Sequence, residues 1–315
     1  MRYMDSILDS IGNTPLIKLN KVSNTGNVFV KAEYLNPSGS LKDRIALEMI
    51  RDAEEKGLLK PGYTIIEAST GNTGTAISFV GTQMGYSVEI YMPEGMTPER
   101  IKIMEAYGAK VHEVEQEGGA NGAVAGAEVE IGTRVKCLAI EKNNSGVWWA
   151  RQFSNSANTR AHVKTGREII RQLAEPVDAF VASIGVGGTL YGVAKALREE
   201  YPDVTIVGLE PDSARYPISE GFYCVPDVDK SVCGGIIEEM MNSGIVDHVV
   251  KVSNSEAVSM SDRLVREEGL FCGISSGANV LMACKLAEEL GDDKNVVTVL
   301  PDHRDRYLSE KKYTT

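Results

Sequence analysis

The chain has 315 residues and a formal net charge of −11, from 33 Lys and Arg against 44 Asp and Glu. With 43% hydrophobic and 24% charged residues its composition is that of an ordinary globular protein, which excludes a largely disordered, collagen-like or coiled-coil chain. The acidic balance argues against a nucleic-acid scaffold, because phosphate binding needs a positive surface field. At roughly 150 residues per domain, the length predicts about two domains.

Strand-length apolar runs alternate with segments of helical periodicity along the chain. The first half is predicted to contain strands over 27–35, 63–68, 88–92 and 110–114, helices over 41–57, 73–85, 101–107 and 122–135, and a short apolar run of strand length over 137–140. The second half is predicted to contain strands over 179–182, 205–209, 249–252 and 296–300, and helices over 162–173, 190–200, 255–269 and 277–290. This alternation predicts parallel sheets covered by helices on both faces, in two α/β domains with a seam near 143–158.

Neither a membrane span nor a secretory signal is predicted, because the chain has no run of about 18 apolar residues and no apolar leader at its start. The cysteines are odd in number and contain no C-x-x-C pair, so we predict neither a disulfide framework nor a zinc or other metal site. Five reduced thiols favour a cytoplasmic protein. These thiols are Cys137, Cys224, Cys233, Cys272 and Cys284.

Four segments place glycine and polar residues where a strand is followed by a helix, which is where ligands bind in parallel α/β sheets. Residues 36–44 (NPSGSLKDR) bring Lys42 to a helix start, where the helix dipole and burial favour a neutral amine that can form a Schiff base. Residues 67–74 (EASTGNTG) offer hydroxyl and backbone N–H groups for a carboxylate. Ordinary helix capping is the alternative interpretation of each segment.

Residues 183–189 (SIGVGGT) form the third segment, a glycine-rich loop that can cradle a phosphate. A dinucleotide site is an alternative, with Glu210 on a ribose, but the third glycine of that fingerprint would fall at Leu190. The fourth segment, residues 273–278 (GISSGA), can present a serine hydroxyl to a heteroaromatic nitrogen.

Together these segments resemble the cysteine synthase (O-acetylserine sulfhydrylase) family of pyridoxal-phosphate enzymes, which also includes the catalytic core of cystathionine β-synthase. The resemblance runs from IGNTPL at 11–16 to Pro301 and Asp302, and NPSGSLKDR, STGNTG, QFSN and GISSGA carry it. It implies a tryptophan synthase β-like fold of two three-layer α/β domains with mostly parallel sheets and the cofactor in the interdomain cleft. The smaller N-terminal domain would span 36–147, and the larger cofactor-binding domain would span 1–35 plus 148–315.

The resemblance also implies pyridoxal 5'-phosphate as cofactor and a role for each matching residue. Lys42 would hold the cofactor as a Schiff base and act as general base, Asn72 would bind the ring hydroxyl, and Ser275 would face the pyridine nitrogen. The phosphate would be held by Gly185, Val186, Gly187, Gly188 and Thr189. The carboxylate of the amino-acid substrate would be bound by Ser69, Thr70, Gly71, Thr73 and Gln152.

The implied activity is β-replacement on an O-activated serine, with O-acetylserine and sulfide giving cysteine and acetate in a homodimer. Within the same chemistry, the alternatives are conversion of cysteine to hydrogen sulfide and serine, synthesis of cystathionine or a diaminopropionate-type product, use of O-phosphoserine, and a related ammonia-lyase, which fits QFSN and GISSGA less well. Two alternatives of other classes are a nicotinamide-dependent oxidoreductase and a non-catalytic binding protein of the same fold. Partners are therefore expected to be a small amino acid and a small nucleophile such as sulfide, with neither nucleic acid nor membrane.

The chain departs from the family pattern at two places. Val186 stands where the family commonly has Thr, which removes one hydroxyl from the phosphate loop. Residues 233–239 (CGGIIEE) replace a glycine-rich segment near the cleft, so Glu238 and Glu239 are either solvated or act on the nucleophile. Arg215 is either solvated or reaches a phosphorylated leaving group. His303 is expected to be structural or on the surface.

Overall fold

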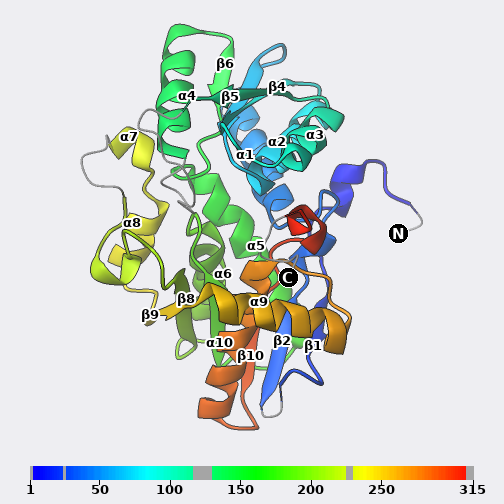
Figure 1. Ribbon diagram of the computed structural model, residues 1–315, viewed down its shortest axis with the longest axis vertical. Helices are drawn as coiled ribbons and strands as arrows, with labels where there is room; N and C mark the ends of the chain where they lie inside the picture. Colours follow the sequence, from blue (N-terminus) through cyan, green and yellow to red (C-terminus); the bar gives the residue numbers. More distant parts are fainter. Residues whose placement is uncertain (1–2, 24–25, 116–129, 225–229, 310–315) are drawn as a thin grey trace.

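The computed structural model describes residues 3–23, 26–115, 130–224 and 230–309. Their strands form two sheets, one of four strands in the order β5-β4-β3-β6 and one of six strands in the order β1-β2-β10-β7-β8-β9. Figure 1 shows the four-stranded sheet with its helices in the upper part of the molecule and the six-stranded sheet below it. In the described residues, no helix is long and apolar enough to cross a membrane.

The four-stranded sheet is entirely parallel. Its strands are β3 (Thr64–Ala68), β4 (Ser87–Pro93), β5 (Lys110–Val114) and β6 (Val147–Trp149), and its helices are α1 (Lys42–Glu55), α2 (Asn72–Gln83), α3 (Pro98–Ala106) and α4 (Ile131–Asn143). Successive side chains of a strand point to opposite faces. Ile65 accordingly packs in the core with α1 and α2, whereas Ile66 packs with Cys137 of α4 on the other face. The sheet is therefore the middle of three layers.

The six-stranded sheet is parallel except for its edge strand β1, which runs antiparallel to β2. Its strands are β1 (Leu16–Lys18), β2 (Asn27–Lys31), β7 (Ala179–Ser183), β8 (Thr205–Pro211), β9 (His248–Val252) and β10 (Asn295–Val299). Two layers of helices cover it, α5 (Ser156–Leu173), α6 (Gly188–Glu200) and α8 (Ile236–Asn242) on one face, and α9 (Asn254–Arg263) and α10 (Ile274–Leu290) on the other. Shorter helical segments are Ile7–Ser10, Glu33–Leu35, Ile218–Glu220, α7 (Lys230–Cys233), Leu264–Glu268 and Arg304–Tyr307. The predicted fold class of two three-layer α/β units with mostly parallel sheets is thus confirmed.

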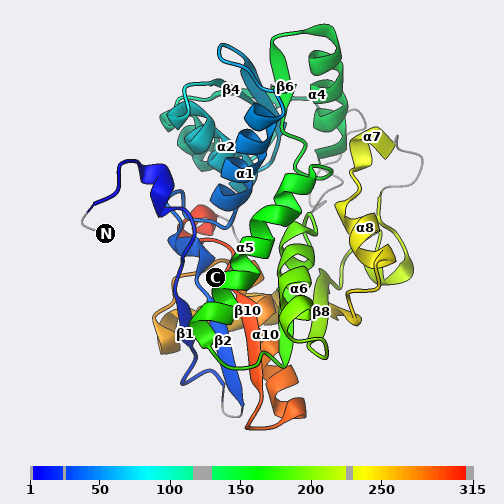
Figure 2. The same ribbon diagram turned by 180° about the vertical axis from the view of Figure 1, so that it is seen from behind.

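Helix α5 joins the two units, because it packs against α1 of the upper unit and α6 of the lower one (Figure 2). A buried ionic cluster reinforces this junction. Arg44 of α1 binds Glu33, which follows β2, and Glu168 of α5, both at 2.7 Å, and Lys31 of β2 binds Glu168 at 2.8 Å. Since Arg44 lies two residues after Lys42, the cluster fixes the start of α1 relative to the larger sheet.

The structure differs from the predicted elements in several short segments. The apolar run 137–140 lies inside α4 rather than forming a strand. Its Cys137 is buried on the side of this helix that packs against β3. Of the helix predicted over 122–135, residues 122–129 lie outside the described residues. Strands β1 and β6, each of three residues, were not predicted, and the domain boundary predicted after residue 147 falls within β6. The domain boundaries themselves stay predictions.

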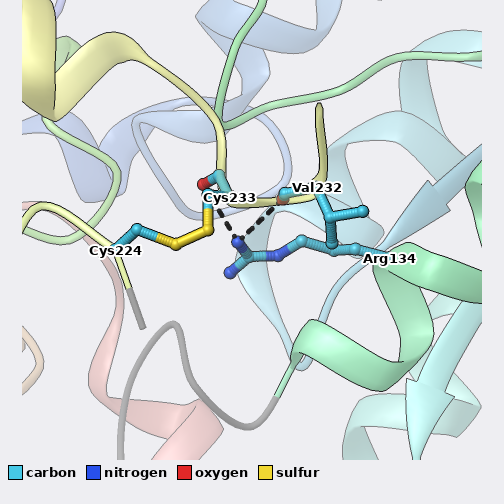
Figure 3. Close-up of a disulfide and its surroundings, with 4 residues drawn as sticks. All are labelled: Arg134, Cys224, Val232 and Cys233. Atoms are coloured by element: carbon cyan, nitrogen blue, oxygen red, sulfur yellow. Dashed lines mark hydrogen bonds between the residues drawn. A yellow bond between two sulfur atoms is a disulfide. The ribbon is translucent and has the colours of Figure 1, made fainter. Parts of the chain in front are cut away.

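The expectation of five reduced thiols was wrong. Cys224 and Cys233 form a disulfide, with Cα atoms 5.6 Å apart, and Figure 3 shows it beside Arg134. The other three cysteines are buried free thiols. Nothing in the sequence indicated this pair, because the two residues are nine positions apart and match no motif. The cytoplasmic assignment rested on reduced thiols and therefore stays a prediction without that support.

Candidate active site

A cavity of about 270 Å³ lies where the starts of α1 and α2 and the loop before α6 converge. Helix starts gather there because each follows the carboxyl end of a strand or a turn that leads into it. Nine of the predicted site residues line it, namely Lys42, Ser69, Thr70, Gly71, Asn72, Thr73, Gln152, Gly185 and Val186. The sequence motifs, which are more than 140 residues apart at their extremes, are thus brought to one place.

Lys42 is the first residue of α1, and the turn before it is held by the following residue. The carboxylate of Asp43 accepts hydrogen bonds from the backbone N–H of Ser38, at 2.7 Å, and from its hydroxyl. Burial lowers the pKa of the Lys42 amine to about 8, although the carboxylates of Glu130 and Asp302 act in the opposite direction. At pH 7 about a tenth of the amine is therefore neutral and nucleophilic, far more than at the ordinary lysine pKa of 10.5.

The hydroxyl groups of the loop that precedes α2 take part in hydrogen bonds that fix its conformation. Ser69 Oγ accepts bonds from the backbone N–H groups of Gly71, at 3.2 Å, and Gly74, at 2.9 Å. Thr73 Oγ1 donates to Gln152 Oε1 at 2.5 Å, which joins this loop to the chain that follows β6. These contacts hold the first turn of α2, with its backbone N–H groups, at the wall of the cavity.

The glycine-rich loop forms the start of α6. Gly187 caps the helix with φ of +90°, and Gly188 is its first residue. A Cβ atom at Gly188 would lie 2.0 Å from Asn158 Oδ1, so only glycine fits there. Gly185 and Val186 line the cavity, whereas Gly187, Gly188 and Thr189 form the helix start behind them. Bare N–H groups at a helix start suit an anionic group.

Ser275 occupies the first turn of α10, is half-buried, and is not among the residues that line the cavity. Its turn is connected to the cavity by a chain of contacts. The Gly273 N–H donates to the carbonyl of Asp302 at 2.9 Å, and the carboxylate of Asp302 accepts a bond from Asn72, which lines the cavity.

Four charged residues of the cavity were not predicted as site residues: Glu99, Arg100, Glu130 and Arg306. Arg306 belongs to the P-D-x-x-x-R-Y ending that the sequence shares with the family, so that ending was the available indication. Arg306 donates to Asn72 Oδ1 and to the Ser38 carbonyl. Glu130 carried no indication, because it lies within a stretch predicted only as helix.

The acidic pair predicted to be solvated or to act near the cleft does not line the cavity. Both residues lie on α8, and the carboxylate of Glu239 accepts a bond of 2.9 Å from the Tyr191 hydroxyl. Glu238 is half-buried and Glu239 exposed. The geometry therefore gives the pair no part in the chemistry of the cavity.

Arg215 and His303 do not line the cavity either. Arg215 lies over the ring of Tyr216, with 5.5 Å between its guanidinium carbon and the ring centre. His303 pairs with Asp305 at 2.9 Å and contacts the ring of Phe271, as expected of a structural residue.

The dinucleotide alternative is not supported by the residues on which it depended. Leu190 is buried in the core beneath β8, where its side chain would be 3.0 Å from a Cβ atom at Gly208. Glu210, the candidate ribose ligand, accepts bonds from the Ile218 N–H at 2.6 Å and from the Ser219 hydroxyl. Its carboxylate is thus engaged by the segment that follows β8.

Comparison with known proteins places this cavity in a family. Residues 7–302 match the family described as pyridoxal-phosphate dependent enzyme. A cysteine synthase of Staphylococcus aureus is 42% identical over 99% of this chain and 97% of that protein. A cysteine synthase structure from Entamoeba histolytica superposes with a TM-score of 0.86 at 34% identity, covering 100% of this chain and 92% of that one. A hydrogen sulfide-producing enzyme of Fusobacterium nucleatum gives a TM-score of 0.83 at 32% identity, covering 97% and 100%.

The chain belongs to the family of pyridoxal-phosphate-dependent enzymes. The residues of the cavity fit this cofactor on grounds of their own chemistry. A lysine with a lowered pKa suits an aldehyde. Gly185 lines the cavity with nothing within 4 Å of an added Cβ, so the backbone that leads into the start of α6 is open to a phosphate.

Proposed function

We propose that this protein catalyses β-replacement on an O-activated serine, with O-acetylserine and sulfide as substrates and cysteine and acetate as products. The single observation that supports this most strongly is the 42% identity to a cysteine synthase over nearly the full length of both chains. The convergence of Lys42 and the loop 69–73 on one cavity is consistent with it. The alternative of a non-catalytic binding protein would not need a lysine with a lowered pKa.

We propose the following roles for the chain's residues. Lys42 Nζ attaches the cofactor, and the phosphate is held by the helix start at 185–189. Asn72 binds the ring hydroxyl, and Ser275 lies at the ring nitrogen. The carboxylate of the substrate is bound by Ser69, Gly71, Thr73 and Gln152, and Thr70, whose N–H and hydroxyl are bonded to Glu130, shapes this loop. The N–H groups at the start of α2 meet this negative charge with dipoles that are already in place.

The bound cofactor supplies an electron sink for the Cα atom of the amino acid attached to it. Lys42 Nζ, freed when the substrate's amino group takes its place on the cofactor, would accept the Cα proton as general base. Acetate leaves Cβ with the bonding electron pair. Hydrosulfide adds at Cβ, and Lys42 returns the proton to Cα. The loop 69–73 and Gln152 hold the carboxylate throughout, so that the Cα–H bond stays aimed at the lysine.

A second candidate is the conversion of cysteine to hydrogen sulfide and serine, in which thiol leaves Cβ and water adds. One observation favours keeping it, the similarity to the Fusobacterium enzyme at 32% identity over 97% of this chain. Both reactions use the same lysine and carboxylate site. They differ only in the group that leaves and the group that adds.

One experiment separates these reactions. The purified holoenzyme is mixed with O-acetylserine, O-phosphoserine or cysteine, and the visible absorption of the cofactor is followed. Sulfide, water alone, homocysteine and amines are then compared as acceptors, with product identified by mass spectrometry. We expect O-acetylserine to change the spectrum and sulfide to restore it with release of cysteine. If no activated serine changes the spectrum, β-replacement from this class of donor is excluded.

The lysine is tested by substitution. In Lys42→Ala, borohydride should no longer fix the cofactor to the polypeptide, and turnover should be lost. Covalent fixation that persists in this variant would contradict the assignment. We also infer a homodimer in the cytoplasm from the family resemblance. Sedimentation equilibrium of the purified protein tests the dimer.

A further inference from the structure

The buried carboxylate of Glu130 is bonded to Thr70 in the loop 69–73. Glu130 Oε1 accepts two hydrogen bonds, from the backbone N–H of Thr70 at 2.7 Å and from Thr70 Oγ1 at 2.9 Å. The Thr70 carbonyl in turn accepts a bond of 3.0 Å from Arg100 Nη1. The N–H, the hydroxyl and the carbonyl of Thr70 are therefore all engaged by side chains of the cavity.

Glu130 is itself held in place from the opposite side. Arg134, one helical turn further along α4, lies with its Nη2 4.0 Å from Glu130 Oε2. Arg134 is buried, its guanidinium lies over the ring of Phe153 with 3.4 Å to the ring centre, and its Nη1 donates to the carbonyls of Val232 and Cys233 (Figure 3). The carboxylate is thus fixed between the loop and this arginine.

We propose that Glu130 is a positioning residue for the proposed reaction. Its two hydrogen bonds to Thr70 fix the loop 69–73 in the conformation that receives the carboxylate of the amino-acid substrate. A carboxylate that bonds both donors of one residue defines the orientation of that residue's peptide plane. Thr70 stands two residues before Asn72, the first residue of α2, so this orientation also sets the direction of the first N–H groups of the helix. Burial of Glu130 keeps water from competing for the two donors.

Three variants test this, together with the wild-type protein. Glu130→Ala removes both acceptors. Glu130→Gln keeps one oxygen that can accept the same bonds, and Glu105→Gln removes one acidic charge from an exposed position on α3 as a matched control. The first readout is amide hydrogen exchange of residues 69–75 without substrate. We expect faster exchange there in Glu130→Ala, wild-type exchange in Glu105→Gln, and recovery towards wild type in Glu130→Gln.

The second readout rests on the proposed function. In Glu130→Ala the KM for O-acetylserine should rise about tenfold with a smaller change in kcat, and Glu130→Gln should recover most of the loss. Unchanged exchange at 69–75 in Glu130→Ala would overturn the proposal, and so would faster exchange spread equally over the whole protein, which indicates a general loss of stability. If the wild type reacts with no activated serine, the proposed function fails, while the exchange data still decide the role of Glu130.

Discussion

Asn72 Nδ2 donates a hydrogen bond of 2.7 Å to Asp302 Oδ2, although 230 positions separate the two residues. Asn72 begins α2 beside the four-stranded sheet, and Asp302 follows β10 of the six-stranded sheet. The bond therefore ties the two units together at the wall of the cavity. Asp302 is buried, and its carboxylate also accepts a bond from the Tyr307 hydroxyl.

The charge of Asp302 should raise the pH at which Lys42 becomes reactive, against the larger effect of burial. Asp302 and Glu130 are the carboxylates that raise the pKa of Lys42 against the effect of burial, and His162, also near Lys42, has its pKa lowered by burial and stays neutral. Because the neutral amine attacks the cofactor, capture of pyridoxal phosphate by the cofactor-free protein should accelerate as pH rises through about 8. In Asp302→Asn this pH midpoint should fall, since one carboxylate that stabilises the ammonium form is gone.

Stopped-flow absorption at a series of pH values on both sides of 8 measures this midpoint. Asp305→Asn is the matched control, because Asp305 is exposed and pairs with His303 away from the cavity. A midpoint that moves equally in both variants, or upward in Asp302→Asn, would show that the carboxylate does not act on Lys42.

Gly188→Ala should destabilise the protein far more than Gly185→Ala. At Gly188 the new methyl group would lie 2.0 Å from Asn158 Oδ1 of a buried side chain, whereas at Gly185 nothing lies within 4 Å. Forcing a methyl group into a packed site typically costs about 1–3 kcal/mol. Urea unfolding of the cofactor-free variants measures the difference without any contribution from phosphate binding. Equal free energies of unfolding would contradict the packing described for the start of α6.

Removing one charge from the buried cluster should be strongly destabilising. In Glu168→Gln, Arg44 keeps one carboxylate partner, and Lys31 loses its ion pair with Glu168 at 2.8 Å. Breaking a buried pair on one side typically costs about 3–5 kcal/mol. Glu199→Gln is the control, because Glu199 and Arg167 form an exposed pair at 4.0 Å that should contribute about 0–1 kcal/mol. Equilibrium unfolding at neutral pH compares the two variants.

The same cluster predicts a pH dependence of stability. Burial acts to raise the pKa of Glu168, but the hydrogen bonds and charges of Arg44 and Lys31 together outweigh it and lower this pKa to about 2, from an ordinary value of 4.5. A depressed folded-state pKa means that the ionised carboxylate stabilises the fold above pH 4.5, and that this contribution is lost as pH falls from there towards 2. The acid-induced loss of stability over this window should be smaller in Glu168→Gln than in wild type. A loss of equal size in both proteins would show that protonation of Glu168 does not contribute to the acid-induced loss of stability.

The disulfide should stabilise the oxidised protein. Closing a loop between residues nine positions apart is worth about 2–3 kcal/mol by restricting the unfolded chain. Reductant should therefore lower the free energy of unfolding of wild type and leave Cys224→Ser unchanged. Alkylation without reductant should modify three cysteines in the unfolded protein and five after reduction. Modification of all five without reductant would rule out the disulfide in solution.

The parts of the fold and the site that depend on residues close together in the sequence could be predicted. The strand–helix alternation produced most elements within a few residues, and the motif around Lys42 placed the lysine at a helix start because turn residues and an apolar helical face follow one another directly. Strands β1 and β6 were not predicted, because three residues are too few to show the apolar–polar alternation of a strand. The partners of Thr70 and the Cys224–Cys233 bond depend on long-range packing, which spacing along the chain does not encode.

The parallel pairing of β2 with β10 has a consequence for synthesis of the protein. Strand β2 is made among the first 31 residues, but the edge that it shares with β10 is satisfied only when residues 295–299 have left the ribosome. The four-stranded sheet, by contrast, draws its strands from residues 64–149 and can assemble early on the nascent chain. An apolar strand with an open edge is a site for aggregation. Chaperone dependence during translation should therefore centre on the N-terminal strand rather than on the first sheet to be completed.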